Sequence, residues 1–214
     1  MDASKKLLIL IGSPRRDGNS ATLATAVQHG AEEAGINVSM RLIDDYISGF
    51  LRDCRNCRLP DGECSISDRF HSLFLDDFLS ADGVVFCTPV YWYGMSAQTK
   101  AFFDRTFCYY ANSYPESQQV LKRMSNKRIG LVLSSEETYP GASLGIIHQL
   151  QEYSRYTYSQ FVGVVRGFGN RRGEVQRDPS SPELDAQRLG REIFERKYTD
   201  YGLDTDRSTQ VWST

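Results

Sequence analysis

The chain has 214 residues, a length that suits one domain of ordinary α/β size. Hydrophobic residues make up 40% and charged residues 24%, so the chain can build a core and is not a disordered protein. The formal net charge of −2 shows no basic excess, and we therefore expect neither nucleic acid nor a membrane as a partner. No apolar run is long enough to span a bilayer and none has the pattern of a signal peptide, which predicts a cytoplasmic protein.

Strand-sized apolar runs alternate with segments of helical periodicity along the chain. Residues 7–11 are continuously apolar and end at Gly12, as expected of a parallel strand buried on both faces. Further strands are predicted over residues 36–43, 83–88, 127–134 and 161–165, and Pro89 is expected to end the strand at 83–88. Helices are predicted over residues 20–34, 97–109, 142–157 and 181–197, and a further helix, capped by Asp68, carries Phe70, Phe74, Phe78 and Leu79.

Five strands that alternate with five helices predict an α/β fold with a doubly wound parallel sheet. We assign residues 1–197 to this one domain and interpret residues 169–182, which are rich in Gly, Arg, Asp and Pro, as a surface loop. Residues 198–214 show no periodicity, and we expect this tail to dock on the domain or on a neighbouring subunit.

The loop at residues 12–20 follows the first strand, at the edge of the sheet where open α/β folds bind ligands. It has neither the glycine spacing of a dinucleotide-binding loop nor the lysine of a triphosphate-binding loop. It is rich in hydrogen-bond donors and precedes a helix N-terminus, which suits a monophosphate held without metal. The candidate phosphate-binding residues are Ser13, Arg15, Asn19 and Ser20. An ordinary capped turn, with Asn19 or Ser20 as the cap, is the alternative.

A second loop follows the third strand and holds three consecutive aromatic residues, which cannot all be core. At the same edge of the sheet they predict a wall against a flat ring, whose edge the backbone N–H groups can bond. The candidate ring-binding residues are Pro89, Val90, Tyr91, Trp92, Tyr93 and Gly94. A cluster that packs against a helix or a second subunit is the alternative. A monophosphate at one end and a planar ring at the other describe FMN.

The chain resembles the NAD(P)H-dependent FMN reductases of flavodoxin-like fold, near the branch of the iron–sulfur flavoproteins. The resemblance covers residues 5–195 and rests on a succession of motifs in the expected order. These are Gly12-Ser13-Pro14-Arg15 with Gly18-Asn19-Ser20, Cys54-x2-Cys57 with Cys64, Thr88-Pro89-Val90-Tyr91-Trp92, and residues 96–105.

This resemblance implies a five-stranded sheet in the order 2-1-3-4-5 and FMN held by the two loops above. It also implies a homodimer or homotetramer whose neighbours help to shape the flavin pocket. A third loop after the fourth strand, beginning at Ser134 and Ser135, is expected to touch the flavin.

Three cysteines lie close together, at Cys54, Cys57 and Cys64, and they are candidate ligands of a metal cluster. Iron–sulfur clusters take four thiolates, and the iron–sulfur flavoproteins carry four cysteines in this loop. The residues Arg58-Leu59-Pro60 stand where another would be expected, while Cys87 and Cys108 lie apart in a strand and a helix. We therefore expect thiols rather than an iron–sulfur cluster here; a zinc site would also need a fourth ligand.

These features predict an FMN-dependent oxidoreductase that takes hydride from NADH or NADPH and passes electrons to a small acceptor such as a quinone or free flavin. Because the flavin carries the chemistry, no nucleophile or general base is needed from the protein. Two alternatives remain open: an iron–sulfur flavoprotein that serves a protein partner, and a flavodoxin-like module without catalytic activity.

Overall fold

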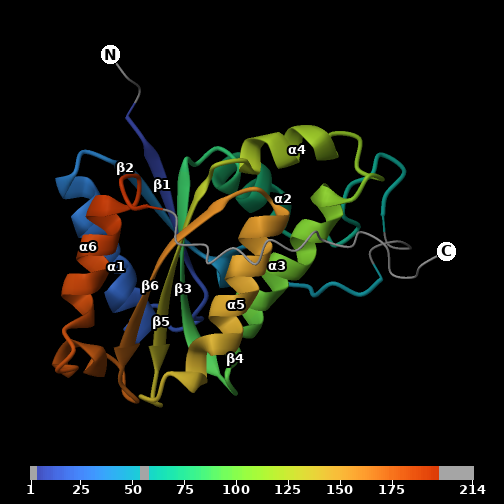
Figure 1. The fold of residues 1–214 in the computed structure, drawn as a ribbon. Coiled ribbons are helices and arrows are strands. Elements are labelled where there is room, and N and C mark those ends of the chain that lie inside the picture. The colour runs from blue at the N-terminus through green and yellow to red at the C-terminus, as the bar shows by residue number, and fades with distance from the viewer. Residues whose placement is uncertain (1–3, 54–57, 198–214) are drawn as a thin grey trace.

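The computed structural model describes residues 4–53 and 58–197, which form a sheet between two layers of helices (Figure 1). The parallel strands are β1 (Lys6–Ile11), β2 (Asn37–Leu42), β3 (Gly83–Tyr91), β5 (Arg128–Ser135) and β6 (Gln160–Phe168). Their order across the sheet is β2-β1-β3-β5-β6, while β4 (Gly94–Met95) pairs antiparallel with β3 outside this path. Counted along the chain, the parallel strands have the predicted order 2-1-3-4-5, so the doubly wound fold is confirmed.

Helices cover both faces of the sheet (Figure 1). One face carries α1 (Asn19–Glu33) and α6 (Pro182–Glu192), and the other carries α3 (Ala97–Tyr110), α4 (Ser117–Met124) and α5 (Gly141–Tyr156). The short helix α2 (Phe70–Ser72) continues into a π-helical segment, Leu73–Phe78, and 3-10 turns lie at Ile43–Asp45 and Glu174–Arg177. No helix in the described parts of the chain has the length and apolarity to cross a bilayer.

The interior strand β1 is apolar at every position from Leu7 to Ile11, and its place in the fold explains this. Successive side chains of a strand point to opposite faces, and both faces of this strand are covered by helices. Leu7, Ile9 and Ile11 pack into the core beneath α1 and α6, whereas Leu8 and Leu10 pack into the core beneath α3 and α5. The edge strand β2 is only partly buried, which fits its alternating sequence.

Two predicted boundaries differ from the structure. The third strand does not end at Pro89: β3 runs on to Tyr91 and turns into a hairpin with β4. β1 pairs with β3 only as far as Cys87, so Pro89 lies where β3 is open on one side and a missing N–H is tolerated. The segment that forms α4 was not predicted as a helix; its buried residues, Ser117, Val120 and Met124, are helically spaced, but only two of them are apolar.

The predicted helix at Asp68 is also shorter and less regular than its phenylalanine spacing indicates, because α2 changes to π geometry after one turn. Asp68 nevertheless accepts a hydrogen bond from the backbone N–H of Phe70 at 3.1 Å, near the start of that helix. Its carboxylate also forms a buried ion pair with Arg105 of α3. This ion pair ties the segment before α2 to α3.

The contact between α1 and α6 depends on two glycines. A Cβ atom on Gly30 of α1 would lie 1.8 Å from the backbone oxygen of Gln187 in α6. A Cβ atom on Gly190 of α6 would lie 2.0 Å from the backbone oxygen of Val27 in α1. Each helix therefore approaches the backbone of the other at a point where no side chain fits.

We expect Gly30→Ala to lower the free energy of unfolding by about 1–3 kcal/mol, because the helices must move apart to admit the methyl group. Urea denaturation followed by circular dichroism measures this change. Gly145→Ala in α5 is the matched control: its Cβ atom would approach no atom closer than 3.7 Å, and we expect it to stabilise the protein by about 0.5–1 kcal/mol through helix propensity. Equal effects of the two substitutions would contradict the close contact.

Candidate functional site

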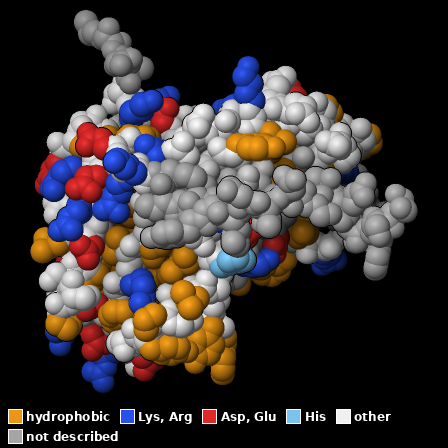
Figure 2. Space-filling view, viewed as in Figure 1, with side chains coloured by type: hydrophobic (Ala, Val, Ile, Leu, Met, Phe, Trp, Pro, Cys, Tyr) orange, Lys and Arg blue, Asp and Glu red, His pale blue; other side chains and the backbone are white. Residues whose placement is uncertain are grey.

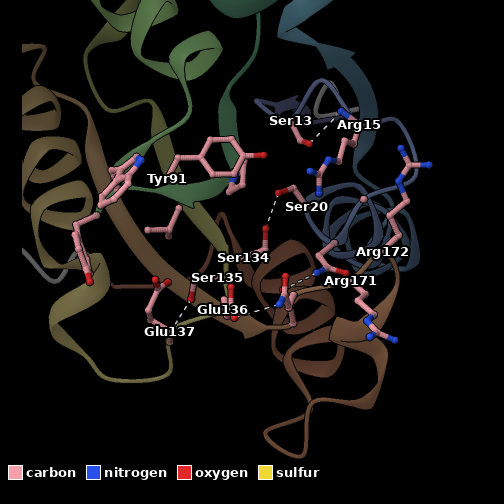
Figure 3. A pocket seen from close by; sticks show the side chains of 18 residues that line it. Ser13, Arg15, Ser20, Tyr91, Ser134, Ser135, Glu136, Glu137, Arg171 and Arg172 are labelled. Carbon is pink, nitrogen blue, oxygen red and sulfur yellow. Dashed lines mark hydrogen bonds between the residues drawn. The ribbon is translucent and has the colours of Figure 1, made fainter.

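A cavity of about 630 Å³ opens at the carboxyl edge of the parallel strands (Figure 3). Its walls come from the loop after β1, the β3–β4 hairpin, the end of β5 and the loop after β6. It is lined by predicted site residues from three separate loops, namely Ser13, Arg15, Asn19, Ser20, Pro89, Val90, Tyr91, Trp92, Tyr93, Ser134 and Ser135. Gly94 is not among the lining residues; it pairs with Tyr91 in the hairpin.

The loop after β1 ends in a helix N-terminus that no side chain of the described chain caps. Gly18 is the N-cap residue of α1, the first turn holds no acidic residue, and the backbone N–H groups of Asn19 and Ser20 have no partner among the described residues. Such uncapped N–H groups carry the positive end of the helix dipole and bind anions. The Arg15 guanidinium, which also has no partner among the described residues, lines the same end of the cavity.

Hydroxyl groups complete this polar end. The Ser20 and Ser134 hydroxyls, from α1 and β5, lie 2.8 Å apart, and Ser13 Oγ accepts a hydrogen bond from the backbone N–H of Arg15 at 3.2 Å. Figure 3 shows Ser13, Arg15 and Ser20 grouped at one end of the cavity, with Tyr91 toward the other. The polar end thus offers hydroxyl, guanidinium and backbone donors to an anionic group.

Asn19 makes structural hydrogen bonds in addition to its predicted contact with a phosphate. Its Nδ2 donates to the backbone oxygen of Gly169 at 2.9 Å, and its Oδ1 accepts from the N–H of Val175 at 3.4 Å. These bonds hold the loop after β6 against the start of α1. One N–H of the Asn19 amide remains for a ligand, so its donation to a phosphate stays a prediction.

The hairpin between β3 and β4 presents the aromatic residues. Trp92 and Tyr93 both have left-handed backbone conformations, with φ of 49° and 61°, as a two-residue turn of this kind requires. For side chains other than glycine this conformation costs about 1–2 kcal/mol per residue. The turn leaves Trp92 95% exposed and Tyr91 and Tyr93 about half exposed, while the Tyr93 ring also packs near Tyr139, with centroids 6.3 Å apart.

The loop after β6 contributes residues to the cavity wall that were not predicted from the sequence. They are Gly169, Asn170, Arg171 and Arg172, together with Glu136 and Glu137 after β5. The predicted surface loop at residues 169–182 is largely exposed in the structure, and its first residues also line the cavity, which was not predicted. Its position after a fifth strand, at the same sheet edge, was the available signal.

Carboxylate groups hold the loop after β6 in place. Glu174 accepts hydrogen bonds from the backbone N–H groups of Asn170 and Arg171, each at 2.8 Å, and these bonds lower the pKa of its carboxyl group. Glu136 accepts from Asn170 Nδ2 at 3.1 Å, and Arg172 forms an ion pair with Asp17 at 3.0 Å. The arginines of this loop therefore face the cavity from a backbone that is held in place.

A buried cluster beneath the cavity positions the first two loops. Ser96 caps α3 by accepting from the N–H of Thr99 at 3.2 Å, and its hydroxyl donates to the backbone oxygen of Gly12 at 2.6 Å. A Cβ atom on Gly12 would lie only 1.8 Å from Thr99 Oγ1, so glycine is needed for this close approach. The end of β1 and the start of α3 are thereby joined.

The structure describes only part of the loop that holds the three candidate metal ligands. Cys54 and Cys57 lie outside the described residues, as does the predicted tail at 198–214. Within residues 4–53 and 58–197, no group of three or more His, Cys, Asp or Glu side chains is arranged to hold a metal ion. Cys64 instead contacts Arg105, with 3.7 Å between Nη2 and Sγ.

The residues around the cavity fit the predicted cofactor. One end carries the uncapped helix, hydroxyls and a guanidinium without a side-chain partner in the described chain, which suit a phosphate monoester. The other end carries half-exposed aromatic side chains, which suit a planar ring. The cavity volume lies within the range of small-molecule sites in proteins.

Comparison with known proteins agrees with this fit. The chain is 26% identical over 174 residues to a putative NAD(P)H-dependent FMN-containing oxidoreductase of Bacillus subtilis, YwqN, covering 81% of this chain and 90% of the relative. It is 32% identical over 101 residues to an iron–sulfur flavoprotein of Methanocaldococcus jannaschii, covering 47% of this chain and 51% of the relative.

Solved structures share the fold at lower identity. The NAD(P)H:quinone oxidoreductase of Methanothermobacter marburgensis superimposes with a TM-score of 0.65 at 18% identity, covering 93% of this chain and all of that chain. The sequence profile of the NADPH-dependent FMN reductase family matches residues 5–164. The resemblance seen in the sequence is confirmed, and the chain belongs to the NADPH-dependent FMN reductase family of oxidoreductases.

Proposed function

We propose that this protein binds FMN in the cavity, accepts electrons from NADPH or NADH, and passes them to a small acceptor such as a quinone or free flavin. The observation that carries this proposal is the division of the cavity into a donor-rich end at Ser13, Arg15 and Ser20 and an aromatic end at Tyr91. A monophosphate and a flat ring system match these two ends, and membership in an oxidoreductase family supports the direction of the chemistry.

When bound, FMN supplies the hydride chemistry, accepting hydride at N5 from the nicotinamide C4. The N-terminus of α1 and Arg15 hold the phosphate by dipole and charge. Backbone N–H groups within residues 90–94 are offered to the edge of the ring, and Ser134 and Ser135 line the cavity between the two ends. Position and electrostatics are the contribution of these residues, since none of them acts as a nucleophile.

The exposed aromatic end suits a slot that donor and acceptor enter in turn. Tyr91 and Tyr93 are about half exposed, so a second flat ring can approach the cavity from solvent beside them. Because donor and acceptor would share one slot, we expect ping-pong kinetics, in which the oxidised nicotinamide leaves before the acceptor binds. We also propose a cytoplasmic location, because nicotinamide nucleotides are supplied inside the cell.

We expect Arg15→Ala to weaken FMN binding by roughly 10- to 100-fold, the equivalent of about 1.5–3 kcal/mol for a charge-assisted hydrogen bond. Quenching of FMN fluorescence during titration measures the affinity. Arg188→Ala is the matched control, because it removes the same charge from an exposed ion pair on α6. Equal affinity of wild type and Arg15→Ala would contradict the placement of the phosphate.

The electron donor is tested by an anaerobic absorption spectrum before and after addition of NADPH. We expect a two-band flavin spectrum that bleaches and then returns when a quinone is added. A broad spectrum that bleaches slowly, together with bound iron, would favour the iron–sulfur alternative instead. Protein that stays colourless after incubation with FMN would favour a module without catalytic activity.

We further propose that the protein is a homodimer or a larger homo-oligomer assembled through the face around the hairpin. Trp92, Tyr93, Tyr139 and Leu144 are each at least half exposed there. Figure 2 shows hydrophobic side chains gathered at the edge of the molecule where Figure 1 draws β4 and the start of α5. Large exposed apolar patches of this kind mark interaction sites, and a second subunit here would lie beside the cavity.

We expect wild-type protein to elute as a dimer or tetramer and Trp92→Glu to shift toward the monomer, because the substitution places a charge in the apolar contact. Size-exclusion chromatography with light scattering measures the mass. Leu184→Glu in α6 is the control, since it places the same charge on an exposed leucine away from this face. A monomer mass for the wild-type protein would contradict the assembly.

A further inference from the structure

The loop after β6 brings two neighbouring arginines, Arg171 and Arg172, to the cavity. Figure 3 shows both on the side of the cavity where Ser20 lies, away from Tyr91. The profile of the reductase family matches residues 5–164 and ends before this loop. The two arginines therefore lie outside the part of the chain by which the family is recognised, and their task is a separate question from that of the loop after β1.

The cavity holds its donors at two depths. The hydroxyl-bearing residues Ser13, Ser20 and Ser134 are only 3%, 2% and 6% exposed, so they form the floor of the polar end. Arg171 and Arg172 are exposed and form its rim; the Arg172 side chain is 62% exposed. Buried donors suit the phosphate of a resident cofactor, whereas charges at the rim meet a molecule that enters from solvent and leaves again. The two groups of donors thus suit two different phosphates.

The side chain of Arg171 is available to a ligand while its backbone is held in place. Within the described part of the chain, its guanidinium makes no hydrogen bond and no ion pair. Its backbone N–H donates to the carboxylate of Glu174 at 2.8 Å, and Asn19 Nδ2 donates to the backbone oxygen of Gly169 at 2.9 Å. The loop therefore does not have to be ordered when an anion binds, which lowers the entropic cost of binding.

The side chain of Arg172 is shared between the chain and solvent. It forms an ion pair with Asp17, in the loop after β1, with 3.0 Å between Nη1 and Oδ2. Both side chains are more than half exposed, so water screens this ion pair and makes it weak. A phosphate group, which a guanidinium binds through two parallel hydrogen bonds, can compete with such a carboxylate.

We propose that Arg171 and Arg172 form a subsite at the cavity rim for the phosphate groups of the nicotinamide dinucleotide donor. The inference rests on the proposed function and deepens it, because it names residues that select the donor. A nicotinamide dinucleotide carries its reactive ring and its phosphates at separate positions. The cavity separates its aromatic end from its arginine rim in the same way.

The charge of the donor indicates which phosphate these arginines hold. NADPH and NADH share a diphosphate, and NADPH alone carries a 2′-phosphate. That group is a monoester with roughly two negative charges at neutral pH, more than either phosphate of the diphosphate carries. Two adjacent guanidinium groups bind the more highly charged group more strongly. We therefore expect the rim to favour NADPH over NADH.

The test titrates FMN-loaded protein with NADP⁺ and with NAD⁺ in a calorimeter, where no turnover takes place. We expect Arg171→Ala to weaken NADP⁺ binding by roughly 5- to 20-fold and NAD⁺ binding by less than about twofold. The value of kcat/KM for NADPH should fall by the same factor as the NADP⁺ affinity. Arg177→Ala is the matched control, because it removes the same charge from the same loop but does not line the cavity.

A gain of affinity tests the part of Arg172. Asp17→Asn removes the carboxylate that competes for this arginine, and we expect NADP⁺ to bind roughly 2- to 5-fold more tightly. Damage to the fold would weaken binding and cannot produce this result. Asp185→Asn is the control, since it removes the same charge from an exposed ion pair on α6. An unchanged or weaker NADP⁺ affinity in Asp17→Asn would contradict the role of Arg172.

The two nucleotides distinguish the two sources of phosphate. An equal loss of NADP⁺ and NAD⁺ affinity in Arg171→Ala would support the subsite and assign it to the diphosphate. Wild-type affinity for both nucleotides in Arg171→Ala and in Arg172→Ala would overturn it. A weaker affinity for FMN with no change for either nucleotide would also overturn it, because the arginines would then hold the phosphate of the cofactor.

The wild-type protein separates this inference from the proposed function. Protein that binds FMN and bleaches with NADPH, while the variants keep their affinity for both nucleotides, would refute the subsite alone. Protein whose FMN is bleached by neither nucleotide would refute the proposed function. In that protein the titration with NADP⁺ still tests the two arginines, because it measures binding and requires no electron transfer.

Discussion

The hydrogen bond from Ser96 to the backbone oxygen of Gly12 is the contact on which the cavity depends. It joins the end of β1 to the start of α3, and the absence of a side chain at Gly12 is what allows Thr99 to come so close. The parallel pairing of β1 with β3 places Ile11, the last residue of β1, opposite Cys87, and β3 runs on from there to Tyr91 at the same edge of the sheet. The loops that leave these strands therefore face one another across one edge of the sheet, and a ligand that spans both is the natural occupant.

Much of the fold could be predicted because its physical causes are local. A run such as residues 7–11, apolar at every position, has few places in a domain other than a doubly covered central strand. Pro89 does not end β3 as predicted, because a missing N–H ends a strand only where a neighbouring strand needs that N–H, and pairing with β1 has already stopped at Cys87. The helix α4 was missed because its apolar signal comes down to a few positions such as Val120 and Met124.

The site was predicted where single loops carry the chemistry and missed where contacts between loops create it. Ser13 and Tyr91 stand in loops whose composition already indicates a ligand, and both line the cavity. Arg171 lies in a loop rich in Gly, Arg, Asp and Pro, a composition that indicates the surface and no particular ligand. Contacts within and between loops place it at the cavity wall: Glu174 accepts from the N–H of Arg171, and Asn19 donates to the backbone oxygen of Gly169.

The net charge of the chain does not describe the charge around the cavity, because acidic and basic side chains are unevenly distributed in space. The total of −2 gives no reason to expect a polyanionic partner, yet three arginines, Arg15, Arg171 and Arg172, are among the residues that line one cavity. Within such a cavity the local field, and not the total charge, determines which ligand is attracted. Glu136 and Glu137 line the same cavity, so its acceptance of anions varies along its length. A ligand with one anionic end and one neutral, flat end suits that variation better than a uniformly charged one.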